Sequence, residues 1–274
     1  MITKTNSKSK SFLRWAGGKR WLTSHIASFL PKNGFNNYHE PFLGGGSIFL
    51  SLRPANSSFL SDSNEELINC YKCLKENVLE VIQYLKEFKN TKEFYYDLRD
   101  ADIDNKTKRA AIFIYLNQTS FNGIYRVNLK GKYNVPYGFR TKDFLDEETL
   151  INISSSLRSA TLFTGDFDLV RKNIRPNDLV FLDPPYTVSH NLNGFIKYNQ
   201  KLFSLDDQYR LASLIDYIKS IGAFYILTNA AHAKVFEIFD KGDSKIELNR
   251  ACVIGGLNAK RGNTSEYIFT NCIE

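Results

Sequence analysis

The tetrapeptide Asp183-Pro184-Pro185-Tyr186 is the feature that most constrains this chain. It follows Asp178 and the apolar, β-forming residues 179–182, which predict a buried strand that ends in a turn. Two consecutive prolines cannot extend a sheet, because neither has a backbone N–H, but each keeps a carbonyl that accepts hydrogen bonds. The strand therefore delivers a carboxylate, a fixed carbonyl and an aromatic ring to its carboxyl end, where open α/β sheets place their sites.

This combination suits a ligand that carries an amino group. The Asp183 carboxylate and the Pro184 carbonyl can together accept both hydrogens of an exocyclic amine, while Tyr186 stacks on the ring that bears the amine. An ordinary proline turn at the end of a strand would show the same four residues. The tetrapeptide alone therefore leaves both interpretations open.

Composition narrows the class of protein. With 274 residues, 43% of them hydrophobic, the chain can form one large domain or a core with an inserted subdomain. No apolar run approaches the roughly 18 residues of a membrane span, and the polar start lacks the apolar segment of a signal peptide. We therefore expect a cytoplasmic protein without membrane contact. The net charge of +7 favours a polyanionic partner.

The cysteines do not indicate a metal site. Cys70 and Cys73 have no second pair or histidine partner at the spacing of a zinc finger, and no other metal-binding or catalytic-cysteine pattern is present. We expect the cysteines to be structural.

A glycine-rich turn follows the short strand expected at residues 38–43. Glycines at positions 44–46 let the backbone approach a ligand closely, and the helix expected after them offers free N–H groups. The dinucleotide fingerprint would need a further glycine at the position of Phe49, so a Rossmann dehydrogenase is disfavoured.

Asp62 ends the next expected strand, residues 58–62. It lies 18 residues beyond Gly44, where an acid can accept both hydroxyls of a ribose. Asp62 also precedes a helix expected from residue 64 to about residue 89, so a role as the helix cap is the alternative.

Residues 65–144 interrupt the alternation of strands and helices with mostly helical patterns. They end in residues 122–138, where alternating residues around Lys130-Gly131 predict a β-hairpin. Between residues 117 and 142 there is no acidic residue, and five basic residues alternate with aromatic ones: Arg126, Lys130, Lys132, Arg140 and Lys142. This mixture favours nucleic-acid binding over a merely solvated hairpin.

The remaining patterns complete an alternating α/β chain. A helix is expected over residues 21–30, and a capping box from Ser204 to Asp207 predicts a helix through about residue 219. Further strands are expected at residues 160–167, 223–229, 252–256 and 266–270.

Five motifs, in order along most of the chain, resemble the Dam family of DNA adenine-N6 methyltransferases. They are Trp15-Ala16-Gly17-Gly18-Lys19, Glu40-Pro41-Phe42-Leu43-Gly44-Gly45-Gly46, Asn122-Gly123 with Arg126, Asn134-Val135-Pro136, and the Asp183 tetrapeptide. One such motif would be weak evidence, but five in register are strong. The resemblance implies a Rossmann-like, seven-stranded α/β fold that uses S-adenosylmethionine, with an inserted, mainly helical target-recognition domain that ends in a β-hairpin. The catalytic domain would comprise residues 1–64 and 145–274, and the recognition domain residues 65–144.

The resemblance also implies roles for individual residues. Residues of the catalytic step would be Asp183, Pro184 and Tyr186. Residues that bind S-adenosylmethionine would be Trp15, Lys19, Pro41, Phe42, Gly44, Gly46, Asp62, Asp166, Phe167 and Asp183. Residues that bind DNA would be Arg14, Phe121, Asn122, Arg126, Lys132 and Pro136. Arg14 stands where the family usually has lysine, and Phe121 replaces a common tyrosine, which keeps aromatic stacking but loses a hydroxyl.

The expected reaction is methylation of adenine N6 in double-stranded DNA, with the base flipped out of the helix. The resemblance suggests the sequence GATC or a related site that contains GAT, and it implies a monomer. Whether a cognate restriction endonuclease exists stays open. The alternatives are methylation of another amine, in RNA adenine, cytosine or protein glutamine, and a DNA-binding regulator without catalysis. The aromatic hairpin argues against the first, and the intact tetrapeptide against the second.

Overall fold

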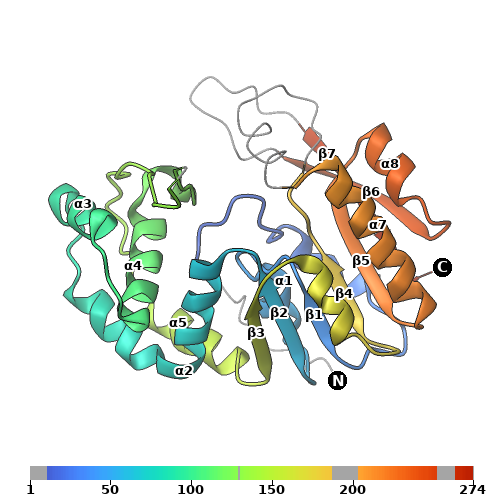
Figure 1. Ribbon diagram of the computed structural model, residues 1–274, viewed down its shortest axis with the longest axis horizontal. Coiled ribbons are helices and arrows are strands. Elements are labelled where there is room, and N and C mark those ends of the chain that lie inside the picture. Colours follow the sequence, from blue (N-terminus) through green and yellow to red (C-terminus); the bar gives the residue numbers. More distant parts are fainter. Residues whose placement is uncertain (1–10, 129, 187–202, 252–262, 274) are drawn as a thin grey trace.

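The computed structural model describes residues 11–128, 130–186, 203–251 and 263–273. Its centre is a seven-stranded sheet with the order β3-β2-β1-β4-β5-β7-β6 (Figure 1). The strands are β1 (Tyr38–Glu40), β2 (Ser58–Asp62), β3 (Ala160–Thr164), β4 (Leu179–Leu182), β5 (Phe224–Ala230), β6 (Ser244–Ala251) and β7 (Asn263–Thr270). Strands β1 to β5 are parallel to one another, and β7 pairs antiparallel with both β5 and β6. The seven-stranded α/β fold that the resemblance implies is therefore confirmed.

The strand order reverses between β1 and β4. The chain leaves β1 towards β2 and β3, then returns to the other side of β1 as β4. At such a point the connections that follow the two strands diverge and leave a crevice at their carboxyl ends. The glycine turn follows β1 and the Asp183 tetrapeptide follows β4, so both motifs lie at the carboxyl ends of the two strands between which the order reverses.

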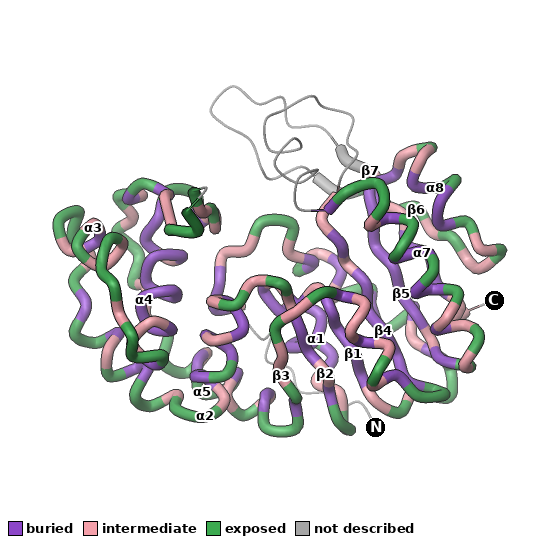
Figure 2. The backbone as a smooth tube through the Cα atoms, viewed as in Figure 1, coloured by how far each residue is buried: buried purple, intermediate pink, exposed green. Residues whose placement is uncertain are grey.

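Helices cover both faces of the sheet. They are η1 (Leu22–Ser24), η2 (Ile26–Phe29), α1 (Ser47–Leu52), α2 (Glu65–Glu87), α3 (Lys92–Asp100), α4 (Lys106–Thr119), η3 (Phe121–Gly123), α5 (Glu147–Ser156), η4 (Phe167–Lys172), α7 (Leu205–Ser220) and α8 (Ala233–Phe239). Successive residues of β4 point to opposite faces: Phe181 joins a core with α1, α2, α4 and α5, whereas Leu182 joins a core with η4, α7 and α8. The central strands β1, β4 and β5 are largely buried between these layers (Figure 2), whereas most described residues of the edge strands β3 and β6 are partly or fully exposed.

The segment between β2 and β3 forms the helical part on one side of the molecule (Figure 1). Helix α2 packs against α4 and α5, but also against β2 and β3. Helices α3 and α4 lie farther from the sheet, with residues 120–144 beside them. The division of the chain at residues 65–144 into a separate recognition domain stays a prediction, and α2 is its link to the sheet.

Residues 21–30 form two short 3-10 turns rather than the single helix that their spacing predicted. Three side-chain hydroxyls donate hydrogen bonds to the backbone carbonyls three residues earlier. The pairs are Thr23 to Arg20, Ser24 to Trp21 and Ser28 to His25. Such bonds compete with the regular helical pattern.

In the segment predicted to form a β-hairpin, residues 122–138, the chain pairs with itself but forms no regular strands among the described residues. Val127 and Tyr133 form an isolated antiparallel bridge, and the backbone N–H of Asn134 donates to the carbonyl of Arg126 at 3.1 Å. The Asn128 side chain accepts from the N–H groups of Lys130 and Lys132, which shapes the tip.

At the C-terminal end of the sheet, the observed strand β6 was not expected. It comes before the strand predicted at residues 252–256, which lie outside the described part of the chain.

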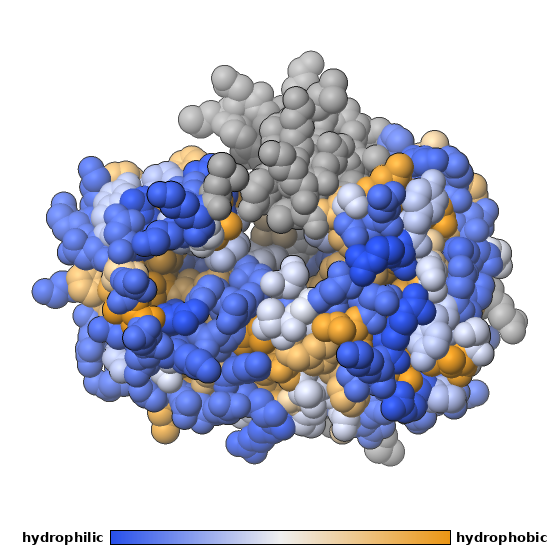
Figure 3. Space-filling view, in the orientation of Figure 1, coloured by the Kyte–Doolittle hydropathy of each residue, from blue (hydrophilic) through white to orange (hydrophobic). Residues whose placement is uncertain are grey.

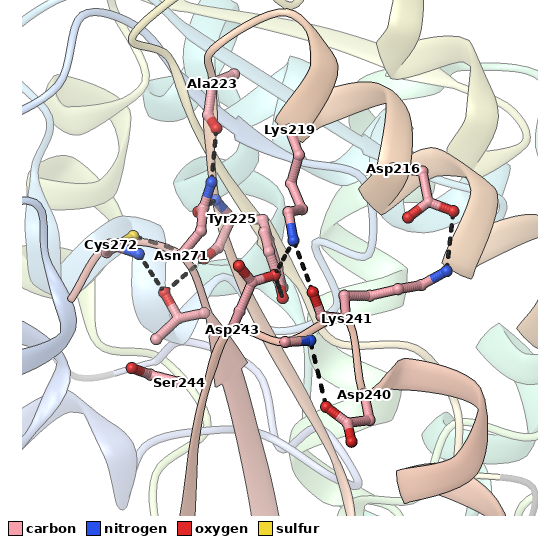
Figure 4. A network of polar contacts seen from close by, with 12 residues as sticks. Asp216, Lys219, Ala223, Tyr225, Asp240, Lys241, Asp243, Ser244, Asn271 and Cys272 are labelled. Atoms are coloured by element: carbon pink, nitrogen blue, oxygen red, sulfur yellow. Dashed lines mark hydrogen bonds and ion pairs between the residues drawn. The ribbon is translucent and has the colours of Figure 1, made fainter. Parts of the chain in front are cut away.

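A network of hydrogen bonds and ion pairs links the first residues of β5 to the residue that follows β7 and to those that precede β6 (Figure 4). The Asp243 carboxylate accepts from Lys219 Nζ at 2.6 Å and from the Tyr225 hydroxyl at 2.8 Å. The Asn271 side chain accepts from the backbone N–H of Tyr225 and donates to the carbonyl of Ala223. These bonds join α7, β5 and the residues just before β6 and just after β7, so the antiparallel strand is held beside β5 at the amino end of that strand.

The surface seen in Figure 3 is mostly hydrophilic. Among the described residues, no helix combines the length and the apolar character that crossing a bilayer would require.

Candidate active site

Asp183 follows β4 as an oriented, mostly buried carboxylate. Its Oδ1 lies 2.7 Å from Lys19 Nζ and accepts from Thr228 Oγ1 of β5 at 2.8 Å. Burial raises the pKa of Asp183, and the Lys19 charge and both hydrogen bonds oppose that rise. Both of these contacts use Oδ1, so the carboxylate is held with Oδ2 available as the second acceptor.

Lys19 is buried to 4% exposure although it carries a charge. Besides Asp183, its ammonium donates to the Gly17 carbonyl at 3.0 Å and lies 4.7 Å from the centre of the Tyr186 ring. It is also 3.9 Å from Glu266 Oε2. The structure therefore brings the Trp15–Lys19 motif to the tetrapeptide, because Lys19 contacts Asp183 directly.

The Tyr186 hydroxyl donates to Glu266 Oε2 at 2.7 Å. Glu266 belongs to β7 and is fully buried. Burial, together with the nearby carboxylates of Asp183 and Glu266, raises the pKa of Tyr186, so the hydroxyl keeps its proton and remains a donor. Neither Glu266 nor Thr228 was predicted as a site residue. The signal in the sequence was a carboxylate within the otherwise apolar strand 266–270.

The glycine turn after β1 has a shape that side chains would obstruct. Gly44 has φ +48°, and a Cβ there would lie 2.9 Å from Trp15 Nε1. Gly46 has φ +63°, and a Cβ there would lie 2.7 Å from the Tyr71 hydroxyl. Left-handed backbone of this kind favours glycine. Trp15 thus lies against the turn, and both predicted glycine positions are explained by backbone conformation and close contact.

Asp62 holds the turn and the start of the next helix. Its Oδ2 accepts from the N–H of Gly44 at 2.9 Å and its Oδ1 from that of Asn64 at 3.0 Å. Burial raises the pKa of Asp62, and these backbone bonds oppose the rise. The N-cap of α2 is Asn64, whose side chain accepts from Leu67 N. The helix-cap alternative for Asp62 is therefore wrong, and its contact with a ribose stays a prediction.

Three phenylalanines meet beside the ends of β1 and β3. The Phe42 and Phe167 rings stack with centroids 5.3 Å apart, and Phe203 lies 5.7 Å from Phe42 and 5.6 Å from Phe167. Asp166 Oδ1 accepts from Asp168 N and pairs with Arg210 Nη2 at 2.7 Å. Phe203 and Arg210 come from the chain around α7 and were not predicted. An amine that reached Asp166 would share this carboxylate with Arg210.

Glu40, at the end of β1, is another buried carboxylate, and the motifs did not single it out for a role. It accepts from the Tyr38 hydroxyl at 2.7 Å and from the N–H of Phe49 at 3.2 Å. Burial raises the pKa of Glu40 to about 8. Glu40 therefore anchors α1 behind the glycine turn, just before Pro41.

Arg14 joins the N-terminal segment to the helical part. Asn117 accepts from Arg14 N at 2.7 Å and donates to its carbonyl at 2.9 Å, while Arg14 Nη1 donates to the Ser120 carbonyl at 3.2 Å. Gly123 has φ +63°, and a Cβ there would lie 2.5 Å from the Arg14 side chain. The Asn122-Gly123 turn thus provides the space that Arg14 occupies.

The remaining predicted DNA-binding residues are exposed on residues 121–136. Two hydrogen bonds to Asn134 orient the Arg126 guanidinium. Its Nε donates to Asn134 Oδ1 at 2.8 Å, and its Nη2 donates to the Asn134 carbonyl at 3.1 Å. The residues exposed with it are Phe121, Asn122, Lys132 and Pro136. The structure places them on one segment, and their contact with DNA stays a prediction.

Comparison with known proteins supports the resemblance seen in the motifs. Residues 15–251 match the family described as D12 class N6 adenine-specific DNA methyltransferase. A type II methyltransferase of Lactococcus lactis subsp. cremoris is 36% identical over 99% of this chain and 98% of its own length. A type II methyltransferase of Methanocaldococcus jannaschii is 37% identical over 83% of this chain and 86% of its own length. A DNA adenine methylase of Serratia marcescens is 33% identical over 76% of this chain and 78% of its own length.

Proposed function

Because the chain belongs to the D12 class N6 adenine-specific DNA methyltransferase family, we propose that it uses S-adenosylmethionine and that Asp183 and Tyr186 present the adenine amine to it. The observation that carries this proposal is the carboxylate of Asp183, which Lys19 and Thr228 hold by one oxygen beside the Tyr186 ring.

The chain's own residues prepare the amine. An adenine amino nitrogen is a poor nucleophile, because its lone pair is delocalised into the ring. Hydrogen bonds from the amine to Asp183 Oδ2 and to the Pro184 carbonyl favour a more tetrahedral nitrogen with a localised lone pair. Tyr186 stacks on the flipped base, which offsets part of the few kcal/mol that unstacking costs. Exclusion of water and alignment of the reacting groups supply much of the rate enhancement.

The residues around the glycine turn suit S-adenosylmethionine, which supplies a methyl group on a sulfonium when bound. The turn leaves no room for a Cβ at Gly44 or Gly46, so the backbone itself can approach the methionine part. Trp15 covers the turn, Asp62 offers carboxylate lone pairs for ribose hydroxyls, and the aromatic rings of Phe42 and Phe167 provide an apolar wall for the adenine part.

DNA would be read from the helical side. Arg14 and Arg126 each carry a guanidinium that can bond guanine O6 and N7 as a pair. We propose a target of GATC or a related GAT-containing site, with Phe121, Asn122, Lys132 and Pro136 in contact with DNA. The names of two relatives as type II methyltransferases favour a cognate restriction endonuclease as partner.

Tritium transfer from S-adenosylmethionine to duplex DNA, RNA and protein acceptors tests the proposal. We expect label in DNA alone, and sequencing of the methylated DNA should place it at one adenine of a short site. Asp183→Ala should nearly abolish transfer with DNA saturating, whereas Asp206→Ala, an exposed aspartate of α7, should match the wild type. Tyr186→Phe should keep substantial activity and Tyr186→Ala should lose most of it. Near-normal transfer by Asp183→Ala would contradict the mechanism.

A further inference from the structure

Glu266 is a buried carboxylate that reaches the site from the antiparallel strand. In β7 it pairs with Ala230 of β5 on one side and Leu248 of β6 on the other. Its side chain is 0% exposed, and its Oε2 accepts from the Tyr186 hydroxyl at 2.7 Å and lies 3.9 Å from Lys19 Nζ. One carboxylate oxygen thus lies between an aromatic residue and a cation that both adjoin Asp183.

The fold alone does not explain a charge at this position. Glu266, Ile268 and Thr270 alternate along β7, so they share one face of the sheet, and all three are fully buried. Ile268 contributes to the apolar core. Burying a carboxylate costs several kcal/mol unless it is paired, and an apolar side chain in such a row is often as stable or more so. Two groups that contact the carboxylate, Tyr186 and Lys19, belong to the site.

The two contacts act on the groups that would hold the substrate. The bond to Tyr186 fixes the ring at its far end, so the ring presents a constant face for stacking. The Glu266 carboxylate lies 3.9 Å from the Lys19 ammonium, so Lys19 is attracted by two carboxylates rather than by Asp183 alone. Loss of Glu266 would let the ring rotate and would leave Lys19 drawn to Asp183 alone.

We propose that Glu266 is a positioning residue for methyl transfer, which orients Tyr186 through its hydroxyl and holds Lys19 between two carboxylates. The inference rests on the proposed roles of Asp183 and Tyr186.

A double-mutant cycle tests the contact with Tyr186. Tyr186→Phe and Glu266→Ala remove the same hydrogen bond, so their effects on kcat, with DNA and S-adenosylmethionine saturating, should not add. We expect Tyr186→Phe to lower kcat about threefold, a change that corresponds to about 0.65 kcal/mol and lies within the range of a typical hydrogen bond. Glu266→Ala should lower it further, and the double variant should be no slower than Glu266→Ala. Multiplied effects would overturn the proposal. The fluorescence of 2-aminopurine at the target position should change alike in both single variants.

The pH profile of kcat gives a second readout that a structural role would not move. Asp183 faces Lys19, which lowers its pKa, and Glu266, which raises it; Glu40 and Tyr186 are the other titratable groups that interact with it. Glu266→Gln keeps the size and an acceptor for Tyr186 but removes the charge. The acid limb of the profile should therefore move to lower pH. An unmoved limb would overturn the proposal, even if Glu266→Ala failed to fold.

Glu247→Gln is the matched control, because it neutralises an exposed glutamate of the neighbouring strand β6. It should leave kcat and the acid limb unchanged. The wild-type protein separates the two levels of inference. Absence of methyl transfer to DNA by the wild type would refute the proposed function, whereas a working wild type with additive variants would refute only the role of Glu266.

Discussion

Replacement of Lys19 by methionine should make the stability of this protein depend more strongly on pH. Methionine keeps much of the aliphatic length but removes the ammonium that lies 2.7 Å from Asp183 Oδ1. The Asp183 carboxylate then stays buried with Thr228 as its remaining donor in the described structure. Breaking a buried ion pair by removing one partner typically costs about 3–5 kcal/mol, because the other charge is left uncompensated.

Protonation of Asp183 limits that cost. Keeping a carboxyl group neutral costs about 1.4 kcal/mol for each unit by which the pH exceeds its unfolded pKa of about 3.9. The ceiling is therefore about 4 kcal/mol at pH 7 and about 1.5 kcal/mol at pH 5. In the variant the pKa of folded Asp183 lies above the unfolded value, so the folded state binds the extra proton. The loss of stability should accordingly be small at low pH and should grow as the pH rises towards the folded pKa.

Urea unfolding followed by circular dichroism at pH 5, 6 and 7 measures this difference. Lys241→Met serves as the control, because Lys241 forms an ion pair with the well-exposed Asp216. Such a surface pair contributes about 1 kcal/mol or less, and its loss should not vary over this pH range. If Lys19→Met lost the same free energy of unfolding at pH 5 and pH 7, Lys19 would not be the charge that keeps Asp183 ionised.

Three further changes test the cofactor site, the DNA contacts and the glycine turn. Asp62→Ala should weaken S-adenosylmethionine binding roughly tenfold or more, as expected for lost hydrogen bonds to a charged group, and an unchanged calorimetric titration would remove Asp62 from that site. Arg126→Ala should cost about 1–3 kcal/mol and relax the preference at one base pair, whereas Lys132→Ala should weaken all duplexes alike and reduce the salt dependence; equal loss on cognate and substituted duplexes would make Arg126 a phosphate contact. Gly46→Ala should lower the free energy of unfolding by more than the roughly 1–2 kcal/mol of a left-handed alanine, because its Cβ would also meet Tyr71. Gly131→Ala is the control, since it has the same backbone strain with nothing within 4 Å of the Cβ. Equal losses of free energy in the two variants would contradict the close contact at Gly46.

Local features of the fold were predictable because they depend on neighbours in sequence. Strand β2 spans the predicted residues 58–62, and the capping box at Ser204 is present with both of its hydrogen bonds. The glycine turn and the tetrapeptide also follow the strands that were expected to carry them. Where hydroxyl side chains bond to nearby carbonyls, as in residues 21–30, apolar spacing alone misjudged the type of helix.

The contacts across the site could not be predicted, because they depend on strand order. Thr228 reaches Asp183 since β5 is the neighbour of β4, and Glu266 reaches Tyr186 although 80 residues separate them. Alternation in the sequence shows that a strand has a buried face, but it does not show which motif that face meets. A carboxylate on such a face, as at Glu266, is the signal that would have marked the position.

The position of β7 also has a consequence for the order in which this protein can mature. Strand β7 comes last among the described strands along the chain, yet it lies between β5 and β6 and carries Glu266 into the site. Chains leave the ribosome from the N-terminus at about 5–20 residues per second, and pairings between distant segments form late. A nascent chain can therefore assemble the glycine turn and display Asp183 well before its Tyr186 has a partner. The proposed role of Glu266 requires that β7 insert before the chain can methylate DNA, so fusions or truncations near this strand should impair activity more than equivalent changes at the tip of residues 128–132.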